Sequence, residues 1–167
     1  MTEVDRLVYS GRLTCLLWDY IMSDIFKSIY AGVAATFAIA ILAYLDRYIE
    51  GAIWLMAPFG ATTVLVFGLP KSPLAQPKNV ILGHLLTAIV GLLFVQFVGV
   101  EPWSMAVATG VGVSLMLLTK TTHPPAGANP ILIMLINPGW SFLLTPVLVG
   151  AAVIALVGYG YKKTLKA

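Results

Sequence analysis

Apolar residues fill this chain in long runs that short polar segments separate. The runs cover residues 28–45, 52–69, 80–98, 103–119, 131–136 and 141–161. A helix needs about 20 apolar residues to cross the roughly 30 Å hydrocarbon core of a bilayer. The long runs are therefore predicted to be membrane-spanning helices, and the chain an all-α membrane protein.

Two of the apolar segments contain residues that interrupt a helix. Pro58, Phe59 and Gly60 lie inside the run 52–69, and the stretch THPPAGANP, residues 122–130, precedes the short run 131–136. Irregular backbone is tolerated inside a membrane only where it is buried in protein or lines a cavity. Paired interruptions of this kind point to a transport site.

Each interruption also carries residues typical of a helix start. Asn129 is a preferred N-cap residue and Pro130 suits the first helical position, while Thr62 is an N-cap type at the first interruption. We therefore predict two half-helices that begin near Thr62 and Asn129, with both N-termini pointing toward the bilayer midplane.

The chain repeats itself at an offset of 67 residues. The first-half positions with an identical partner in the second half are Pro58, Gly60, Ala61, Leu65, Gly83, Ala88 and Gly91. Each half, about 28–98 and about 103–161, then holds a span, an interrupted segment and a span. Three crossings per half make the halves an inverted repeat, whereas re-entrant interruptions would leave two crossings per half and parallel halves.

Lysine and arginine positions favour six crossings, two of them interrupted. Cytoplasmic loops are enriched in these residues. With six crossings and both termini cytoplasmic, Arg47 is the one basic residue of 10 outside. With re-entrant segments, Lys71, Lys78 and Lys120 move outside as well. The expected organisation is a cytoplasmic or interfacial amphipathic segment 1–27, a transport domain 28–161 and a basic tail 162–167.

Composition agrees with a membrane domain and with little else. Hydrophobic residues make up 59% of the chain, charged residues 10%, and the mean hydropathy is +0.93. Soluble domains carry roughly a quarter charged residues. The net charge of +3 lies in the loops and indicates topology, so no nucleic-acid partner is expected. The single cysteine, Cys15, excludes an intrachain disulfide.

The two interruptions together predict a site for a small anion. A helix N-terminus presents unpaired N–H groups and about half a positive charge. Two such ends facing each other would bind an anion without a central lysine. The predicted substrate-binding residues are Gly60, Ala61, Thr62, Thr63, His123, Gly127, Ala128 and Asn129.

Three further residues are candidates for auxiliary roles. His123 and His84 are the only histidines and could couple a proton to transport, because histidine titrates near neutral pH. His84 could instead cap or snorkel. Lys120 could attract anions at a vestibule or simply set topology. No metal-ligand spacing, nucleophile–base pair or phosphate loop is present, so we expect no enzyme, metal or cofactor.

Two stretches resemble the HPP family of small integral membrane proteins. Residues 123–128, HPPAGA, match the motif that names the family, and residues 57–84, APFGATTVLVFGLPKSPLAQPKNVILGH, resemble its other signature, with Lys78 where arginine is expected. The resemblance covers about residues 28–161. Family members of cyanobacteria and plastids are linked to nitrite transport, so the resemblance implies a small monovalent anion. The family is often described as having four spans.

The sequence thus predicts a nitrite or similar small-anion transporter or channel in a bacterial inner membrane. An aquaporin-like channel for a neutral solute is an alternative, because Ala128-Asn129-Pro130 resembles the aquaporin half-helix motif. A membrane scaffold without transport activity is another. A homo-oligomer of unknown order is expected.

Overall fold

A computed structural model describes residues 12–49 and 54–165, with side chains from residue 22 onward. Every regular element in these ranges is a helix, which confirms the all-α prediction. The chain separates into two compact units, residues 1–33 and 34–167, and each is described by itself. The predicted amphipathic segment 1–27 lies mostly among residues whose side chains the structure does not describe.

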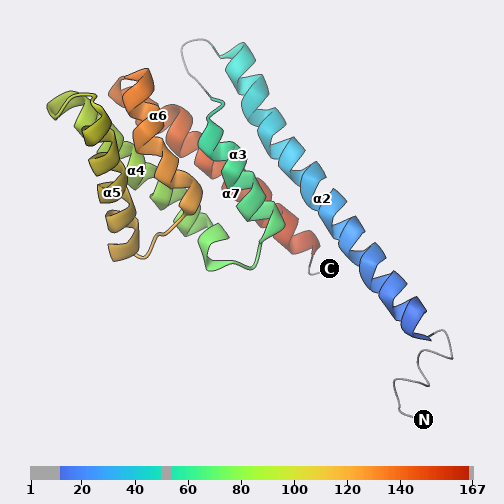
Figure 1. Ribbon diagram of the computed structural model, residues 1–167. Helices are drawn as coiled ribbons and strands as arrows, with labels where there is room; N and C mark the ends of the chain where they lie inside the picture. Colours follow the sequence, from blue (N-terminus) through green and yellow to red (C-terminus); the bar gives the residue numbers. More distant parts are fainter. Residues whose placement is uncertain (1–11, 50–53, 166–167) are drawn as a thin grey trace. The chain divides into compact units, whose positions relative to one another are not determined.

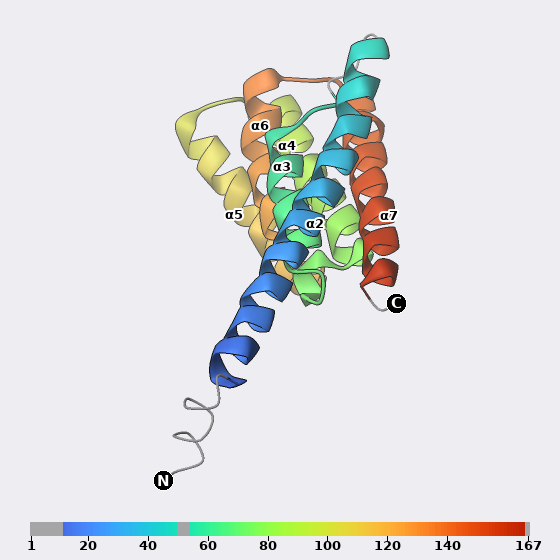
Figure 2. The same cartoon turned by 90° about the vertical axis from the view of Figure 1, so that its right-hand side faces the viewer.

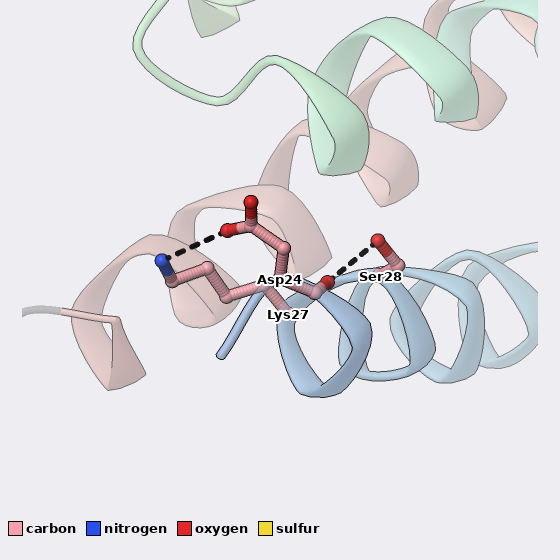
Figure 3. A network of polar contacts seen from close by, with 3 residues as sticks. All are labelled: Asp24, Lys27 and Ser28. Atoms are coloured by element: carbon pink, nitrogen blue, oxygen red, sulfur yellow. Dashed lines mark hydrogen bonds and ion pairs between the residues drawn. The ribbon is translucent and has the colours of Figure 1, made fainter. Parts of the chain in front are cut away.

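The unit 1–33 is represented by the first part of helix α2 (Arg12–Tyr48, 37 residues), which continues into the second unit. The helix passes residues 27 and 28 without a break, where the sequence suggested a lead followed by a span. Figure 3 shows the polar contacts here: Lys27 Nζ lies 3.4 Å from the Asp24 carboxylate, and the Ser28 hydroxyl donates to the Asp24 carbonyl. The exposed ion pair precedes residues 28–45, which are mostly apolar and carry no charge, as at a membrane surface.

The second unit contains the remaining helices. They are α3 (Ala57–Thr63), the π-helical turn η1 (Val64–Gly68), the 3₁₀ turn η2 (Pro73–Ala75), α4 (Pro77–Phe97), α5 (Pro102–Leu118), the 3₁₀ turn η3 (Pro124–Ala128), α6 (Asn129–Ile136), the 3₁₀ turn η4 (Trp140–Leu143), the π-helical turn η5 (Leu144–Leu148) and α7 (Val149–Thr164). These boundaries match the predicted apolar runs closely.

Successive helices from α3 to α7 run in alternating directions (Figures 1 and 2). By length and hydropathy, three described helical stretches could cross a membrane, Met22–Tyr48, Pro77–Phe97 and Trp140–Thr164. Three shorter apolar stretches, Ala57–Gly68, Pro102–Leu118 and Pro124–Ile136, lie between them. The six crossings and the inverted repeat therefore remain predictions.

The second interrupted segment is part extended and part helical. His123 has extended backbone angles, the tight turn η3 follows, and α6 continues from it. A 3₁₀ turn rises about 2 Å per residue against about 1.5 Å in an α-helix, so this mixture reaches farther than an α-helix of equal length. α6 ends at Ile136, and Asn137 after it takes the left-handed conformation.

Glycines allow α4 and α7 to approach the interrupted segments. A Cβ on Gly91 would lie 3.1 Å from Ile133 Cβ, and one on Gly158 would lie 2.3 Å from Val66 Cγ1. Gly91 and Gly158 are 67 residues apart, and so are Val66 and Ile133, so the two contacts correspond to each other in the repeat. Each long helix thus packs on the interrupted segment of the other half, a reciprocal contact that a two-fold repeat predicts. Gly83, Gly112 and Gly150 also sit at close contacts, whereas Gly110 does not.

Large apolar side chains cover the exterior, and a group of polar side chains lies inside an otherwise apolar core. Large apolar side chains such as Leu118, Phe97 and Leu156 are 79%, 73% and 70% exposed. The interior holds the polar side chains Thr62, Thr63, His84, Thr87, Ser104, Thr121, His123 and Asn129. An apolar exterior suits contact with lipid, because hydrocarbon offers no partner to polar groups.

Candidate functional site

Four of the predicted residues meet in the interior of the second unit. Thr62, His84, His123 and Asn129 are each 0% exposed. Thr62 comes from the last turn of α3, His84 from α4, His123 from the residue before η3, and Asn129 from the start of α6. The cluster therefore joins both interrupted segments through the long helix α4.

The Thr62 hydroxyl is the centre of this cluster. Its Oγ1 lies 2.9 Å from His84 Nε2 and 3.0 Å from His123 Nε2. It also lies 2.9 Å from the Pro58 carbonyl oxygen, one turn back on α3. A hydroxyl has one hydrogen to donate and two lone pairs that accept. The Pro58 oxygen and one imidazole nitrogen must therefore share, or alternate in using, the same hydrogen.

A backbone carbonyl determines the tautomer of His123. Its Nδ1 lies 2.8 Å from the carbonyl oxygen of Leu74 in η2. A carbonyl oxygen only accepts, so Nδ1 carries the hydrogen. In an uncharged ring Nε2 is then an acceptor, and it receives the Thr62 hydroxyl hydrogen.

Asn129 determines the tautomer of His84 in the same way. Asn129 Nδ2 donates to the His84 carbonyl oxygen at 3.1 Å, which requires the amide nitrogen on this side. The same nitrogen lies 3.0 Å from His84 Nδ1 and 3.1 Å from Thr87 Oγ1, so its two hydrogens are shared among three acceptors. Because Asn129 Nδ2 is a donor, His84 Nδ1 is the acceptor in their contact. His84 then carries its hydrogen on Nε2 and donates it to Thr62.

The bonds thus form one directed chain from Asn129 through His84, Thr62 and His123 to the Leu74 carbonyl. Two uncharged rings satisfy every link, with ring centroids 5.1 Å apart. The Phe59 and His84 rings pack edge to face, with their centroids 5.2 Å apart, so apolar surface covers His84 there. An uncharged polar network is far less costly to bury than separated ions.

One polar atom of the cluster has no partner. Asn129 Oδ1 is buried and accepts no hydrogen bond, although the residue is completely enclosed. An unpartnered buried acceptor costs about 1–3 kcal/mol, so native structures rarely retain one without a use. This oxygen is a candidate contact for a solute that can donate a hydrogen bond.

The other predicted binding residues lie outside the cluster. Gly60, Ala61 and Ala128 are exposed, and Gly127 is half-buried. Thr63 is buried, but its hydroxyl donates to the Gly60 carbonyl at 2.7 Å. The structure therefore brings together the residues with hydrogen-bonding side chains, and it leaves the small residues at the periphery.

The predicted helix starts are right for one segment and wrong for the other. α6 begins at Asn129 as predicted, but η3 leads directly into it, and the Asn129 side chain makes no capping bond. α3 begins at Ala57, five residues before Thr62. Pro58 does not break this helix, because a proline in the first turn removes an N–H that has no partner there. Thr62 therefore offers its hydroxyl, not a free backbone N–H.

Sequence reasoning missed three contributors to the cluster. Thr87 accepts from Asn129 Nδ2 at 3.1 Å and donates to the Gly83 carbonyl. Its position one helical turn after His84 was the available signal, since residues three apart share a helix face. Gly83 lets His123 approach, because a Cβ there would lie 2.9 Å from His123 Cβ. The Leu74 carbonyl had no sequence signal at all.

A separate basic cavity lies beside η2. It has a volume of about 380 Å³, and its polar lining includes Gln76, Tyr159, Lys162 and Lys163. Lys162 Nζ donates to Gln76 Oε1 at 2.7 Å, and Lys163 Nζ lies 4.7 Å from the Tyr159 ring centroid. Lys120, the predicted vestibule residue, is exposed at the end of α5 and does not line this cavity.

Within the described residues, no three histidine, cysteine or acidic side chains are grouped as a metal site requires. The Thr62 hydroxyl lies between the two imidazole rings, one of which serves as donor and the other as acceptor. What this arrangement can do is exchange hydrogen bonds with a small solute.

The comparison with known families decides where the chain belongs. The transmembrane region of the HPP family matches residues 22–167. The chain belongs to the HPP transmembrane family. The match includes all four cluster residues, and it confirms the resemblance seen in residues 57–84 and 123–128.

Two proteins of Dictyostelium discoideum, named only as transmembrane proteins, are similar to this HPP-family chain. One is 40% identical over 110 residues, which cover 61% of this chain and 39% of the relative. The other is 34% identical over 126 residues, which cover 71% of this chain and 40% of the relative. The matches thus span about two fifths of each relative's length. No solved structure matches the chain.

Proposed function

We propose that this HPP-family protein carries a small monovalent anion, nitrite or one similar to it, across the membrane. The observation that carries the proposal is the buried cluster of Thr62, His84, His123 and Asn129 in a domain whose exterior is apolar. Ionisable and polar groups inside a membrane are costly and usually serve a function. Both interrupted segments supply residues to the cluster, which places it where a transport site is expected.

Side chains, not bare helix ends, would hold the anion. Nitrite has only acceptor atoms, so it needs donors, and the Thr62 hydroxyl and the Asn129 amide can supply them. Both donors are bonded to the imidazole rings in this structure. An anion would therefore enter by displacing a ring from its partner. The weak net binding that results suits a transported solute, which must also leave.

The basic cavity is the proposed vestibule on the cytoplasmic side. Lys162 and Lys163 present two cationic ends beside Gln76, and Gln76 lies two residues after Leu74, which bonds to His123. Cavities of one charge sign raise the local concentration of the opposite ion. Anions would thus gather close to one end of the central cluster.

The proposed topology is six crossings with both termini cytoplasmic, in a bacterial inner membrane. Three observations support the six crossings: the alternating helix directions, the reciprocal glycine contacts and the distribution of lysine and arginine. We further propose a homo-oligomer that catalyses no reaction.

A neutral-solute channel is a second candidate. The unpartnered Asn129 Oδ1 favours it, since that oxygen can accept from an N–H or O–H group but repels an anion. Currents or tracer uptake that require an anion would separate the two functions.

The test is uptake of labelled nitrite by vesicles containing purified variants. Asn129→Leu and Thr62→Leu should each reduce protein-dependent uptake at least tenfold while membrane insertion is retained. Thr109→Leu is the matched control, because Thr109 lies on α5 and bonds only to its own helix at the Met105 carbonyl. Unchanged uptake in both cluster variants would contradict this site.

A further inference from the structure

We propose that the His84–Thr62–His123 chain conducts one proton with each anion that crosses, so that transport is electroneutral. This inference rests on the proposed transport function and adds the coupled ion. Its basis is that three hydrogen-bonding groups from α4, α3 and the second interrupted segment are joined at 2.9 and 3.0 Å.

The chain of bonds has a single direction at rest. Carbonyl acceptors at both ends determine it: the His84 carbonyl orients the Asn129 amide, and the Leu74 carbonyl binds His123 Nδ1–H. Between them, His84 Nε2–H donates to Thr62, and Thr62 O–H donates to His123 Nε2. Each group therefore has a hydrogen to give forward and a lone pair to receive one from behind.

A proton crosses this chain by one transfer at each link. A proton arriving at His84 Nδ1 replaces the bond from Asn129 and makes the ring a cation. His84 then gives its Nε2 proton to Thr62, and Thr62 gives its own proton to His123 Nε2. His123 finally releases its Nδ1 proton to water or to the anion, so one proton enters and one leaves.

After one transfer His84 carries its hydrogen on Nδ1 and His123 carries its hydrogen on Nε2, so both rings must return to their starting tautomers before a second proton crosses. The Pro58 carbonyl offers the Thr62 hydroxyl hydrogen a second position. Thr62 Oγ1 is 2.9 Å from this oxygen, as close as it is to His84. When the hydroxyl hydrogen turns to Pro58, His123 Nε2 loses its donor and the chain is interrupted. Rotation of one hydroxyl thus opens and closes the path without movement of the backbone.

Both ends of the chain lie at features suited to exchange. At the His84 end, Asn129 Oδ1 is a free buried acceptor that can hold the hydrogen of a protonated anion. At the His123 end, Leu74 belongs to η2, and the next two residues, Ala75 and Gln76, line the basic cavity. The His123 end thus lies close in sequence to residues that line the basic cavity, and the His84 end has a free acceptor beside it.

The two histidines titrate without charged neighbours in the cluster. α3 contributes Thr62 and Phe59, α6 contributes Asn129, and η2 contributes a carbonyl, and none of these carries a charge. The lysines nearest in sequence, Lys71, Lys78 and Lys120, are exposed. Two ring cations 5.1 Å apart would repel strongly in a medium of low dielectric constant, so the chain holds one extra proton at a time.

The test uses the purified full-length chain in vesicles that contain a pH-sensitive dye and labelled nitrite outside. Equal potassium with valinomycin holds the membrane potential at zero, and empty vesicles give the background from nitrous acid. We expect nitrite addition to acidify the lumen. An acid exterior should drive nitrite accumulation about tenfold per pH unit, the ratio for one proton per anion.

Thr62→Val removes the linking hydroxyl and keeps the side-chain shape. It should reduce proton-coupled uptake at least tenfold, and Thr62→Ser should restore it. Thr109→Val is the matched control, since the Thr109 hydroxyl bonds to the Met105 carbonyl of its own helix and lies outside the cluster, so coupling should be unchanged. Thermal unfolding in detergent checks that the variants fold.

Distinct outcomes separate the two proposals. Nitrite uptake that follows the membrane potential and ignores the pH gradient would overturn the proton relay and leave anion transport standing. Coupled uptake that survives in Thr62→Val, with the variant folded, would also overturn the relay. No protein-dependent uptake under any gradient would overturn the transport function itself.

Discussion

At the scale of single residues, the geometry of the cluster depends on a glycine. Gly83 faces His123 and Thr121, and an added Cβ would lie 2.9 Å from His123 Cβ and 3.1 Å from the Thr121 carbonyl oxygen. Neither atom is the far end of a flexible side chain, so α4 or the segment before η3 would have to shift. His123 would then lose its alignment with Thr62.

Gly83→Ala should therefore destabilise the protein by about 1–3 kcal/mol, the usual cost of overpacking a filled interior. It should also reduce nitrite uptake. Gly110→Ala is the control, because nothing lies within 4 Å of a Cβ there and alanine favours the helix by about 1 kcal/mol. Unfolding in a graded denaturant measures both. Equal stability of the two variants would contradict the tight approach.

The lysines of the basic cavity allow a second prediction at this scale. A Lys162→Gln, Lys163→Gln double variant should slow nitrite uptake several-fold at low ionic strength, because the local anion concentration falls. The difference should fade near 1 M salt, where charges are screened over about 3 Å. Lys120→Gln should have little effect, since Lys120 lies outside the cavity. A larger effect from Lys120 would favour the vestibule predicted from sequence.

At the scale of helices, the reciprocal packing of the two halves can be tested by compensation. Gly158→Ala should cost about 1–3 kcal/mol, because the new Cβ would lie 2.3 Å from Val66 Cγ1. Val66→Ala removes that atom and should recover much of the loss in the double variant.

The same cycle applies to Gly91 and Ile133, the pair at the offset of 67 residues. A Cβ on Gly91→Ala meets Pro130 Cα at 3.0 Å, Ile133 Cβ at 3.1 Å and Ile133 Cγ2 at 3.2 Å. Ile133→Ala removes only the Cγ2 contact, so it should recover less of the loss than Val66→Ala does. Chemical denaturation of single and double variants gives the coupling free energy. Strictly additive effects at both pairs would show that these helices are not in contact as described.

Hydrophobic runs predicted the helices because a membrane-spanning helix requires a long apolar segment, and the length of such a segment can be counted directly in the sequence. The start of α3 was missed because Pro58 can either break a helix or begin one, and the structure uses the second option. The sequence also could not show that His84 reaches across to Thr62 and Asn129, since those contacts join residues 22 and 45 positions apart. The polar residue types inside apolar segments indicated which residues belong to the cluster. Which of them bond to each other depends on how the helices pack, and the sequence does not show this.

At the scale of the whole molecule, the proposed topology predicts which loops share a side of the membrane. Single cysteines at Lys71 and Lys120 in a Cys15→Ser background should react from the cytoplasmic side. Cysteines at Val100 and Gly139 should react from the opposite side. A membrane-impermeant maleimide applied to oriented vesicles measures this. Labelling of the Lys120 and Gly139 positions from the same side would support re-entrant segments instead.

The central claim is that this chain by itself forms a path for a small anion through the cluster of Thr62, His84, His123 and Asn129. The most direct measurement is the time course of labelled nitrite in vesicles that contain only the purified protein, beside empty vesicles and vesicles with Asn129→Leu. The account predicts protein-dependent uptake that the substitution abolishes. Uptake equal to that of empty vesicles, or uptake unaffected by Asn129→Leu, would contradict it.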